Sequence, residues 1–211
     1  MEGSRLLLCR PLGGLNDILC QIERACRYGE SFGRSVVIDT NYHCTRSFQD
    51  KFSKYFVTAQ EGLVLDSDAI EDRMAETDVA PDFIAGRVGQ YITRYDPRAE
   101  IFVEQETGRA VTFDFNKDHP ERLLVHHGEG GGALSVFALS RLRLQDSLVA
   151  VLRQRLSQIG RPYTAIHIRH TDYKCEYEEW IARHKAEIEG PLFVATDNRD
   201  TLAYCKSVFG A

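Results

Sequence analysis

The chain has 211 residues, of which 43% are hydrophobic and 27% charged, and its formal net charge is −5. This length and composition suit a soluble globular protein with a packed core, as one large domain or two small ones. The acidic balance argues against a general nucleic-acid-binding protein, which carries a basic binding face, so we expect any phosphate site to be local.

The first 40 residues predict a strand, a turn, a helix and a second strand. RLLLC (5–9) is a short apolar run, and PLGGLND ends it with a proline and two glycines. Apolar residues recur at helical spacing in residues 18–33, and the strand SVVIDT follows, ending at Asp39. This order is a βαβ unit, so we expect a parallel sheet.

The middle of the chain is less regular. Residues 41–122 mix aromatic residues with acidic loops, and we predict only short strands near 101–103 and 110–115. RLLVHH (122–127) predicts another strand, and the GEGGG run after it cannot be regular structure. We interpret GEGGG as a linker or a lid; the alternative is a loop whose backbone amides approach an anion.

The last part of the chain predicts one long helix and a second βαβ unit. Leucine, valine and isoleucine recur at mostly helical spacing over 135–160, which predicts an amphipathic helix that Gly160 ends. The elements expected after it are a strand at 163–169, a helix around 176–188, a strand at 191–196 and a helix from about 199 to 208. We therefore predict two lobes, residues 1–160 and 161–211.

No signal in the chain predicts export or a membrane span. The apolar core of the N-terminal stretch runs only from Leu6 to Cys9, shorter than that of a signal peptide, and no apolar run approaches the roughly 20 residues that span a bilayer. The six cysteines are scattered without a CxxC pair, as is usual for reduced thiols. We expect a cytoplasmic protein; peripheral association with a membrane and the oligomeric state stay open.

Three predicted strands end in polar or glycine-rich loops: PLGGLND, HIRHTDYK and ATDNRD. Ligands of open α/β sheets bind at the carboxyl ends of the strands, so these loops predict a cleft. His167 and Arg169 share one face of their strand. The planar fork of Arg169 suits a diphosphate, and the alternative is a structural ion pair with Asp172 or Asp197. His167 either contacts a ligand or is a satisfied structural histidine.

Other uses of these loops are also open. A metal site built from His167, His170 and Asp172 is disfavoured, because the two histidines point to opposite faces if the strand continues. GGLND resembles half of a dinucleotide fingerprint, and the alternative is a tight turn that lets strand and helix pack closely. Asp197 suits a guanine edge or a ribose, or with Thr196 it caps the helix that follows.

The ordered blocks GGLND with VVIDT, AIHIRHTDYK, and LFVATDNRDTLAYCKSVFG resemble the fucosyltransferase superfamily. That superfamily includes nodulation, core α1,6- and, more distantly, α1,2- and protein O-fucosyltransferases. The resemblance implies a GT-B-like α/β architecture of two Rossmann-like lobes with parallel sheets. It also implies inverting transfer of fucose from GDP-fucose, or of another sugar from its GDP-sugar, to a bacterial glycan or lipid-linked saccharide, without a metal or another cofactor.

The resemblance also implies roles for individual residues. Arg169 looks like the arginine that grips the β-phosphate, and His167 like the histidine that helps to hold the nucleotide. Asp197 and Asn198 occupy the place where an acid reads the guanine, while Asp172 and Lys174 match the close of the arginine motif. The remaining predicted substrate-binding residues are Gly13, Gly14, Asn16, His170 and Thr196. For the catalytic base, Asp17 and Asp39 are the candidates.

Two departures from the family pattern qualify these expectations. His170 stands where the family has a second arginine, which weakens one phosphate donor. A donor lobe of about 50 residues is also smaller than an ordinary domain, so we expect the second lobe to be incomplete. A rival hypothesis is a non-catalytic remnant that binds a nucleotide or glycan; an NAD-dependent enzyme would need a complete glycine fingerprint.

Overall fold

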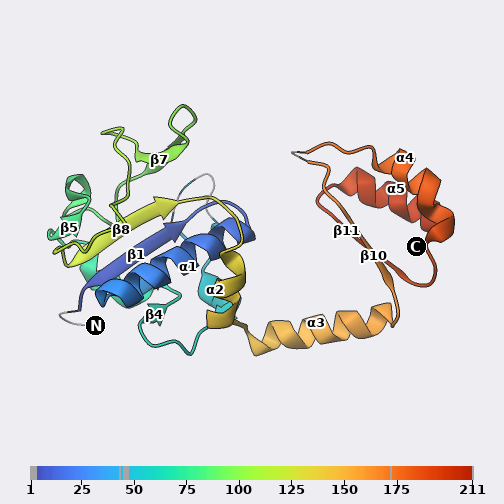
Figure 1. The fold of residues 1–211 in the computed structure, drawn as a ribbon, viewed down its shortest axis with the longest axis horizontal. Coiled ribbons are helices and arrows are strands. Elements are labelled where there is room, and N and C mark those ends of the chain that lie inside the picture. Colours follow the sequence, from blue (N-terminus) through green and yellow to red (C-terminus); the bar gives the residue numbers. More distant parts are fainter. Residues whose placement is uncertain (1–3, 43, 45–47, 172, 211) are drawn as a thin grey trace. The chain divides into compact units, whose positions relative to one another are not determined.

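The computed structural model describes residues 4–42, 44, 48–171 and 173–210. The chain divides into two compact units, Met1–Gln145 and Asp146–Ala211, each of which combines helices and strands (Figure 1). The division differs from the predicted boundary after residue 160, since it falls before helix α3 (Asp146–Ile159). None of the residues of α3, all of which are described, is buried.

The first unit is built on a five-stranded sheet in the order β4-β2-β1-β8-β5, in which every neighbouring pair is parallel. Its strands are β1 (Leu6–Pro11), β2 (Ser35–Ile38), β4 (Leu63–Val64), β5 (Val79–Ala80) and β8 (Leu123–Gly128). Helix α1 (Leu15–Phe32) joins β1 to β2. The predicted βαβ unit and its parallel sheet are therefore confirmed, although β1 continues beyond the predicted run to Pro11.

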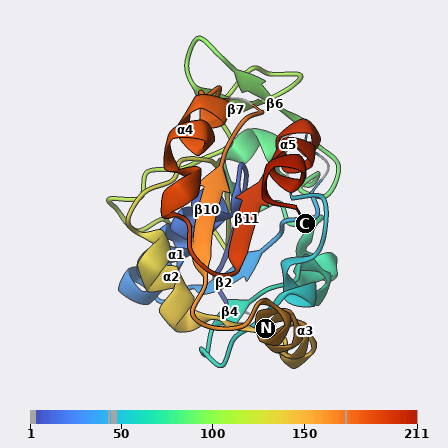
Figure 2. The ribbon, with the colours of Figure 1, turned by 90° about the vertical axis from the view of Figure 1, so that its right-hand side faces the viewer.

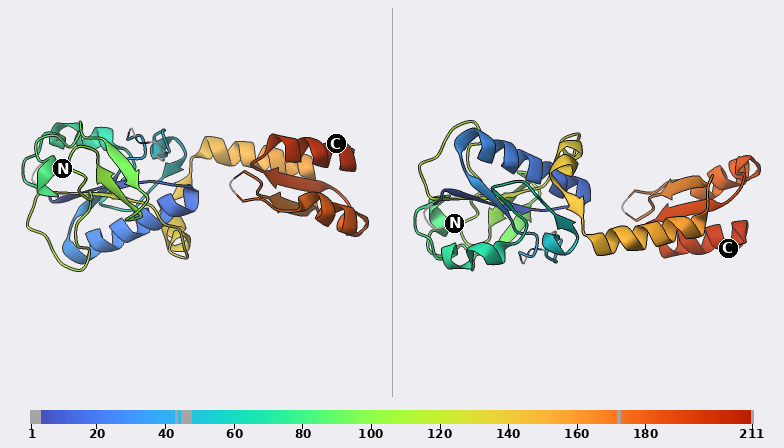
Figure 3. Two further views of the ribbon diagram at one scale, coloured as in Figure 1. Left: turned by 90° about the horizontal axis from the view of Figure 1, so that it is seen from above. Right: turned by 90° about the horizontal axis from the view of Figure 1, so that it is seen from below.

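Side chains of β1 alternate between two cores on opposite faces of the sheet. Leu7 and Cys9 pack with buried residues of α1, while Leu6 and Leu8 join the cluster on the other face, which residues from the 70–111 segment complete. α1 covers the first face beside α2 (Ser135–Arg141), as Figure 1 and both views of Figure 3 show. Both faces of this sheet are covered, as is typical of parallel sheets.

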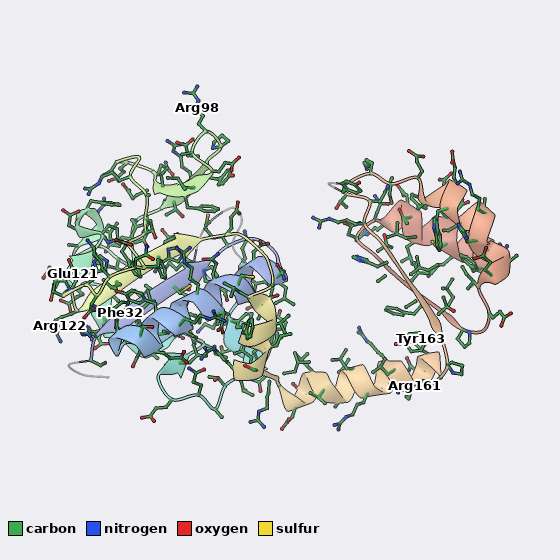
Figure 4. The ribbon with its side chains drawn as sticks, in the orientation of Figure 1. Phe32, Arg98, Glu121, Arg122, Arg161 and Tyr163 are labelled. Carbon is green, nitrogen blue, oxygen red and sulfur yellow. The ribbon has the colours of Figure 1, made fainter. Side chains whose placement is uncertain are left out.

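Residues 41–122 form short elements, as expected. They are η1 (Phe52–Lys54), β3 (Phe56–Val57), β4, η2 (Ser67–Arg73), β5, η3 (Asp82–Ile84), β6 (Thr93–Asp96) and β7 (Ile101–Glu104). β6 and β7 pair as an antiparallel hairpin, and Arg98 points outward from its turn (Figure 4). The strand predicted at 110–115 is wrong: Ala110 forms a single bridge to Val103, and no described strand pairs with residues 111–115.

The single long helix predicted over 135–160 is also wrong. α2 ends at Arg141, β9 (Arg143–Leu144) pairs antiparallel with β3, and α3 begins at Asp146. Leu142 has an extended backbone and packs, 6% exposed, into the core beneath α1. Pairing and burial at this point outweigh the helical periodicity. Gly160, with a φ of +78°, follows the last residue of α3, as predicted.

The second unit contains the predicted second βαβ arrangement. β10 (Thr164–Ile168) and β11 (Leu192–Thr196) are parallel neighbours (Figure 2). Between them lies α4 (Tyr177–His184), which is shorter than predicted and followed by η4 (Lys185–Glu187). α5 (Arg199–Phe209) follows β11. The buried core is small and contains Ile168, Ile181 and Cys205.

Among the described residues, no helix combines the length and the hydropathy that crossing a membrane requires.

Candidate functional site

The loops after β10 and β11 lie beside each other in the second unit. The two strands are parallel and end at the paired residues Ile168 and Thr196, so the loops that follow them leave the sheet at the same edge. The Asp197 carboxylate connects them: Oδ1 accepts a hydrogen bond from the His170 backbone N–H at 2.8 Å, and Oδ2 accepts one from the Thr171 hydroxyl at 2.7 Å. Two motifs distant in sequence thus form one surface.

Asn198 completes this junction and begins helix α5. Its Oδ1 accepts from the backbone N–H groups of Asp200 and Thr201 at 2.9 and 3.0 Å, which is the geometry of an N-cap. Its Nδ2 donates to the His170 carbonyl at 3.4 Å. The alternative in which Thr196 and Asp197 cap the helix is wrong, because Asn198 is the cap and Asp197 bonds to the other loop.

His167 and Arg169 are exposed at the end of β10, as the pleat predicts, while Ile168 is buried between them. His170 is half-buried: its ring meets Tyr177 edge-on with ring centroids 4.8 Å apart. Lys174 donates from Nζ to the His170 carbonyl at 3.0 Å. The His170 side chain is therefore part of the packing of its own turn. Asp172 lies outside the described residues.

The GGLND turn belongs to the first unit, between β1 and α1. Gly13 has a φ of +94°, a left-handed conformation that favours glycine. Asp17 Oδ2 accepts from the backbone N–H of Gly14, the residue before the helix, at 2.9 Å. The tight-turn interpretation of GGLND is confirmed, and the carboxylate of Asp17 stabilises that turn.

The GEGGG loop after β8 is fastened to the start of α1. Asn16 Oδ1 accepts from the backbone N–H of Gly132, and Asn16 Nδ2 donates to Ser135 Oγ, both at 2.8 Å. A Cβ at Gly131 would lie 2.2 Å from Asn16 Oδ1, so a residue without a side chain lets the loop approach. Asn16, predicted to bind substrate, holds this loop in the described structure.

Sequence reasoning missed a buried polar network at the carboxyl ends of β1, β2 and β8. Arg10 donates from Nε to Asp39 Oδ2 at 2.9 Å, and from Nη1 to the Val88 carbonyl and the Tyr91 hydroxyl at 2.9 and 2.8 Å. The Tyr91 hydroxyl also bonds to His127 Nε2 at 2.6 Å. The only sequence signals were an arginine inside an apolar strand and the paired histidines of RLLVHH.

The electrostatics of this network favour a charged arginine and a neutral histidine. Burial disfavours the Arg10 charge, but Tyr91 and Asp39 outweigh it, so the pKa of Arg10 is raised above its ordinary value. Burial, and then the Arg10 charge, hold the pKa of His127 well below its usual range. Asp39, one of the two candidates for the base, is 6% exposed and bound in this ion pair.

The sequence motifs therefore separate into two groups. HIRHTDYK and ATDNRD meet in the second unit, whereas GGLND, GEGGG and the Arg10 network belong to the first. Within the described part of the chain, no three histidine, cysteine, aspartate or glutamate side chains converge in an arrangement suited to a metal ion.

Comparison with solved structures identifies similar folds. The crystal structure of the fucosyltransferase NodZ from Bradyrhizobium has a TM-score of 0.59 at 16% identity, and the match covers 98% of this chain and 77% of that one. A NodZ alpha-1,6-fucosyltransferase crystal soaked with GDP-fucose gives a TM-score of 0.61, covering 98% of this chain and 75% of that one, again at 16% identity. A crystal grown with GDP gives 0.58 at 16% identity, covering 98% of this chain and 76% of that one.

No family model matches the sequence, and no curated protein matches it. The expected resemblance to fucosyltransferases is thus confirmed at the level of the fold, a mixed α/β structure with a parallel central sheet.

Proposed function

We propose that this chain is a glycosyltransferase that moves fucose from GDP-fucose to a hydroxyl group of a saccharide. One observation carries the proposal: the loops of Arg169 and Asp197 meet at the carboxyl edge of the parallel strands β10 and β11. Nucleotides bind at this edge in open α/β sheets. The similar fold of NodZ, whose crystals were soaked with GDP-fucose or grown with GDP, supports the same proposal.

In the proposed donor complex, Arg169 donates to the β-phosphate and His167, on the same strand face, contacts the nucleotide. Asp197 accepts from guanine donors. Both of its oxygens accept hydrogen bonds from the first loop, and a carboxylate accepts several hydrogen bonds at once. The contacts with His170 and Thr171 would then orient the carboxylate before the nucleotide binds.

The proposed reaction is a displacement at the sugar C1 with inversion. The bond between C1 and the β-phosphate oxygen breaks, and its electron pair stays with GDP. The acceptor oxygen forms the new bond to C1 from the opposite face and loses its proton to a base. A fixed guanidinium at Arg169 would stabilise the negative charge that develops on the leaving phosphate, which is the task that this step sets when no metal takes part.

A second candidate function is nucleotide or glycan binding without transfer. The observation that favours it is the engagement of both carboxylates considered for the base. Asp17 accepts from the Gly14 backbone, and Asp39 is paired with a buried arginine. Transfer of radiolabelled fucose from GDP-fucose to a mixture of saccharide acceptors separates the two candidates, since a binder releases no labelled product glycan.

Isothermal titration with GDP and GDP-fucose tests the donor site. We expect Arg169→Ala to weaken both by about tenfold to a hundredfold, the scale of a hydrogen bond between charged groups. Arg183→Ala is the matched control: Arg183 lies on α4 in the same unit, is exposed and pairs only with Glu179 at 3.0 Å among the described residues. We expect this control to bind like the unmodified chain.

The same titration with UDP tests whether the site distinguishes guanine from another nucleobase. Weaker binding of UDP than of GDP is expected if Asp197 accepts from guanine, which has donors that uracil does not match. Failure of the unmodified chain to bind GDP, or equal affinity for GDP after Arg169→Ala, would contradict the assignment of the donor site.

A further inference from the structure

A pocket of about 340 Å³ lies in the first unit, where β1 and β2 end. Arg10, Asp39, Tyr42 and Tyr91 are among the residues that line it. Residues from the 67–92 segment complete the lining. A pocket of this volume is within the range that holds small ligands. It shares no residue with the loops after β10 and β11.

Arg10 brings an unused donor to this pocket. Its Nε and Nη1 bond to Asp39, to the Val88 carbonyl and to Tyr91. Within the described part of the chain, Nη2 donates no hydrogen bond, although the Arg10 side chain is only 3% exposed. Nη2 is not among the described side-chain atoms that are both fully buried and unpaired, so it keeps access to solvent. An oxygen atom of a ligand in the pocket would satisfy it.

Charge decides which kind of oxygen fits. Asp39 neutralises Arg10 across a 2.9 Å ion pair, and among the described residues no other charged side chain lines the pocket. A phosphate or carboxylate would therefore enter a site with no net positive charge, at the full cost of its desolvation. An uncharged oxygen, such as a hydroxyl group, accepts from the arginine without that cost.

The rim of the pocket carries groups that both donate and accept. The side chains of Asn41, Ser67 and Gln90 line it, and none of them forms a hydrogen bond with another described residue. Amide and hydroxyl groups match sugar hydroxyls, which also donate and accept. Ile92, 47% exposed, and Met74 add apolar contact suited to the C–H groups of a sugar ring.

From this geometry we infer that the pocket binds one unit of a neutral saccharide. Arg10 Nη2 donates to one ring hydroxyl, and the amides of Asn41 and Gln90 bond to others. The identification of that saccharide as the acceptor rests on the proposed function. The binding itself rests on the lining of the pocket.

Saturation-transfer NMR of the full chain with lactose, cellobiose and N,N′-diacetylchitobiose tests the inference. We expect at least one of these neutral disaccharides to receive saturation. Asn41→Ala and Gln90→Ala should each weaken its binding about threefold to tenfold, the scale of a neutral hydrogen bond. Both residues are exposed, so the fold should survive. Gln154→Ala, at an exposed amide on α3, is the control that should leave binding unchanged.

Any of three results would overturn the inference. They are no saturation transfer to any of the three disaccharides, unchanged disaccharide affinity in both pocket variants, and displacement of the bound sugar by inorganic phosphate. A parallel titration with GDP keeps the two proposals distinct. Saccharide binding without GDP binding would refute the donor site and leave the pocket supported. GDP binding without saccharide binding would refute the saccharide pocket and leave the donor site supported.

Discussion

Asp39 and Asp197 occupy equivalent places in the two units but have opposite surroundings. Each directly follows a parallel strand, β2 or β11, and each carboxylate bonds to the neighbouring strand's end. Asp39 is 6% exposed and pairs with Arg10, which is 2% exposed. Asp197 is exposed and accepts from the backbone of His170 and the hydroxyl of Thr171.

The difference follows from how much structure covers each sheet edge. In the first unit, two large clusters of buried side chains enclose the sheet, and Tyr42 and Tyr91 close over Arg10. In the second unit the buried core is small, and Phe193 of β11 is 44% exposed. A polar contact at a strand end is thus enclosed where the sheet edge is well covered, and exposed where it is not.

The largest expected effect is the loss of the buried ion pair. We expect Asp39→Asn to lower the free energy of unfolding of the first unit by about 3–5 kcal/mol, because the Arg10 charge stays buried without its partner. Urea titration monitored by far-ultraviolet circular dichroism measures this change. A loss below about 1 kcal/mol would mean that the pair is no stronger than a surface salt bridge.

Acidification should destabilise the first unit next. Burial, with a smaller contribution from Arg24, lowers the pKa of His126 to about 3, and burial lowers that of His127 well below its usual range. The unfolded chain, with an ordinary histidine pKa of about 6.5, therefore takes up protons first as the pH falls. The free energy of unfolding therefore has its full value above about pH 6.5. Below that pH it declines by about 1.4 kcal/mol per pH unit for each of the two histidines.

Urea titrations between neutral pH and about pH 5 measure this slope, which extends down to the folded-state pKa values. His126→Gln should remove the contribution of one histidine, while His184→Gln, on the exposed end of α4, should leave the slope of the first unit unchanged. An unaltered slope in His126→Gln would show that this histidine is not buried neutral.

A smaller effect is expected at the cap of α5. Asn198→Ala removes the acceptor for the backbone N–H groups of Asp200 and Thr201 and should cost the second unit about 1 kcal/mol. Asn198→Ser keeps a capping oxygen and should recover most of that loss. Thermal unfolding of the three proteins provides the comparison; equal midpoints would exclude a capping role.

The smallest expected change in stability is at Asp197. Asp197→Asn keeps an acceptor oxygen at an exposed position, so we expect a loss below about 1 kcal/mol. GDP affinity should nevertheless fall by more than UDP affinity, because an amide offers guanine one acceptor oxygen in place of two. A large loss of stability with unaltered GDP affinity would make Asp197 a purely structural residue.

The sequence predicted both βαβ units because apolar runs, glycine turns and helical periodicity are local patterns. It failed at Leu142, where the periodicity continues but the chain turns into β9. The competing interactions there are pairing with β3 and burial beneath α1, which no local pattern contains. For GEGGG the sequence predicted a linker or a lid; the contact of this loop with Asn16, more than a hundred residues earlier, is one that no local pattern contains.

Local sequence patterns identify which polar loops follow strands and therefore lie at the edges where ligands bind. What each polar group does there depends on contacts between residues far apart in the sequence. Arg10 and Asp39 are 29 residues apart, and His170 and Asp197 are 27 residues apart, so each pair forms only when neighbouring strands align. The rings of Tyr42 and Tyr91 then cover the first pair, while Arg169 and Asp197 stay exposed.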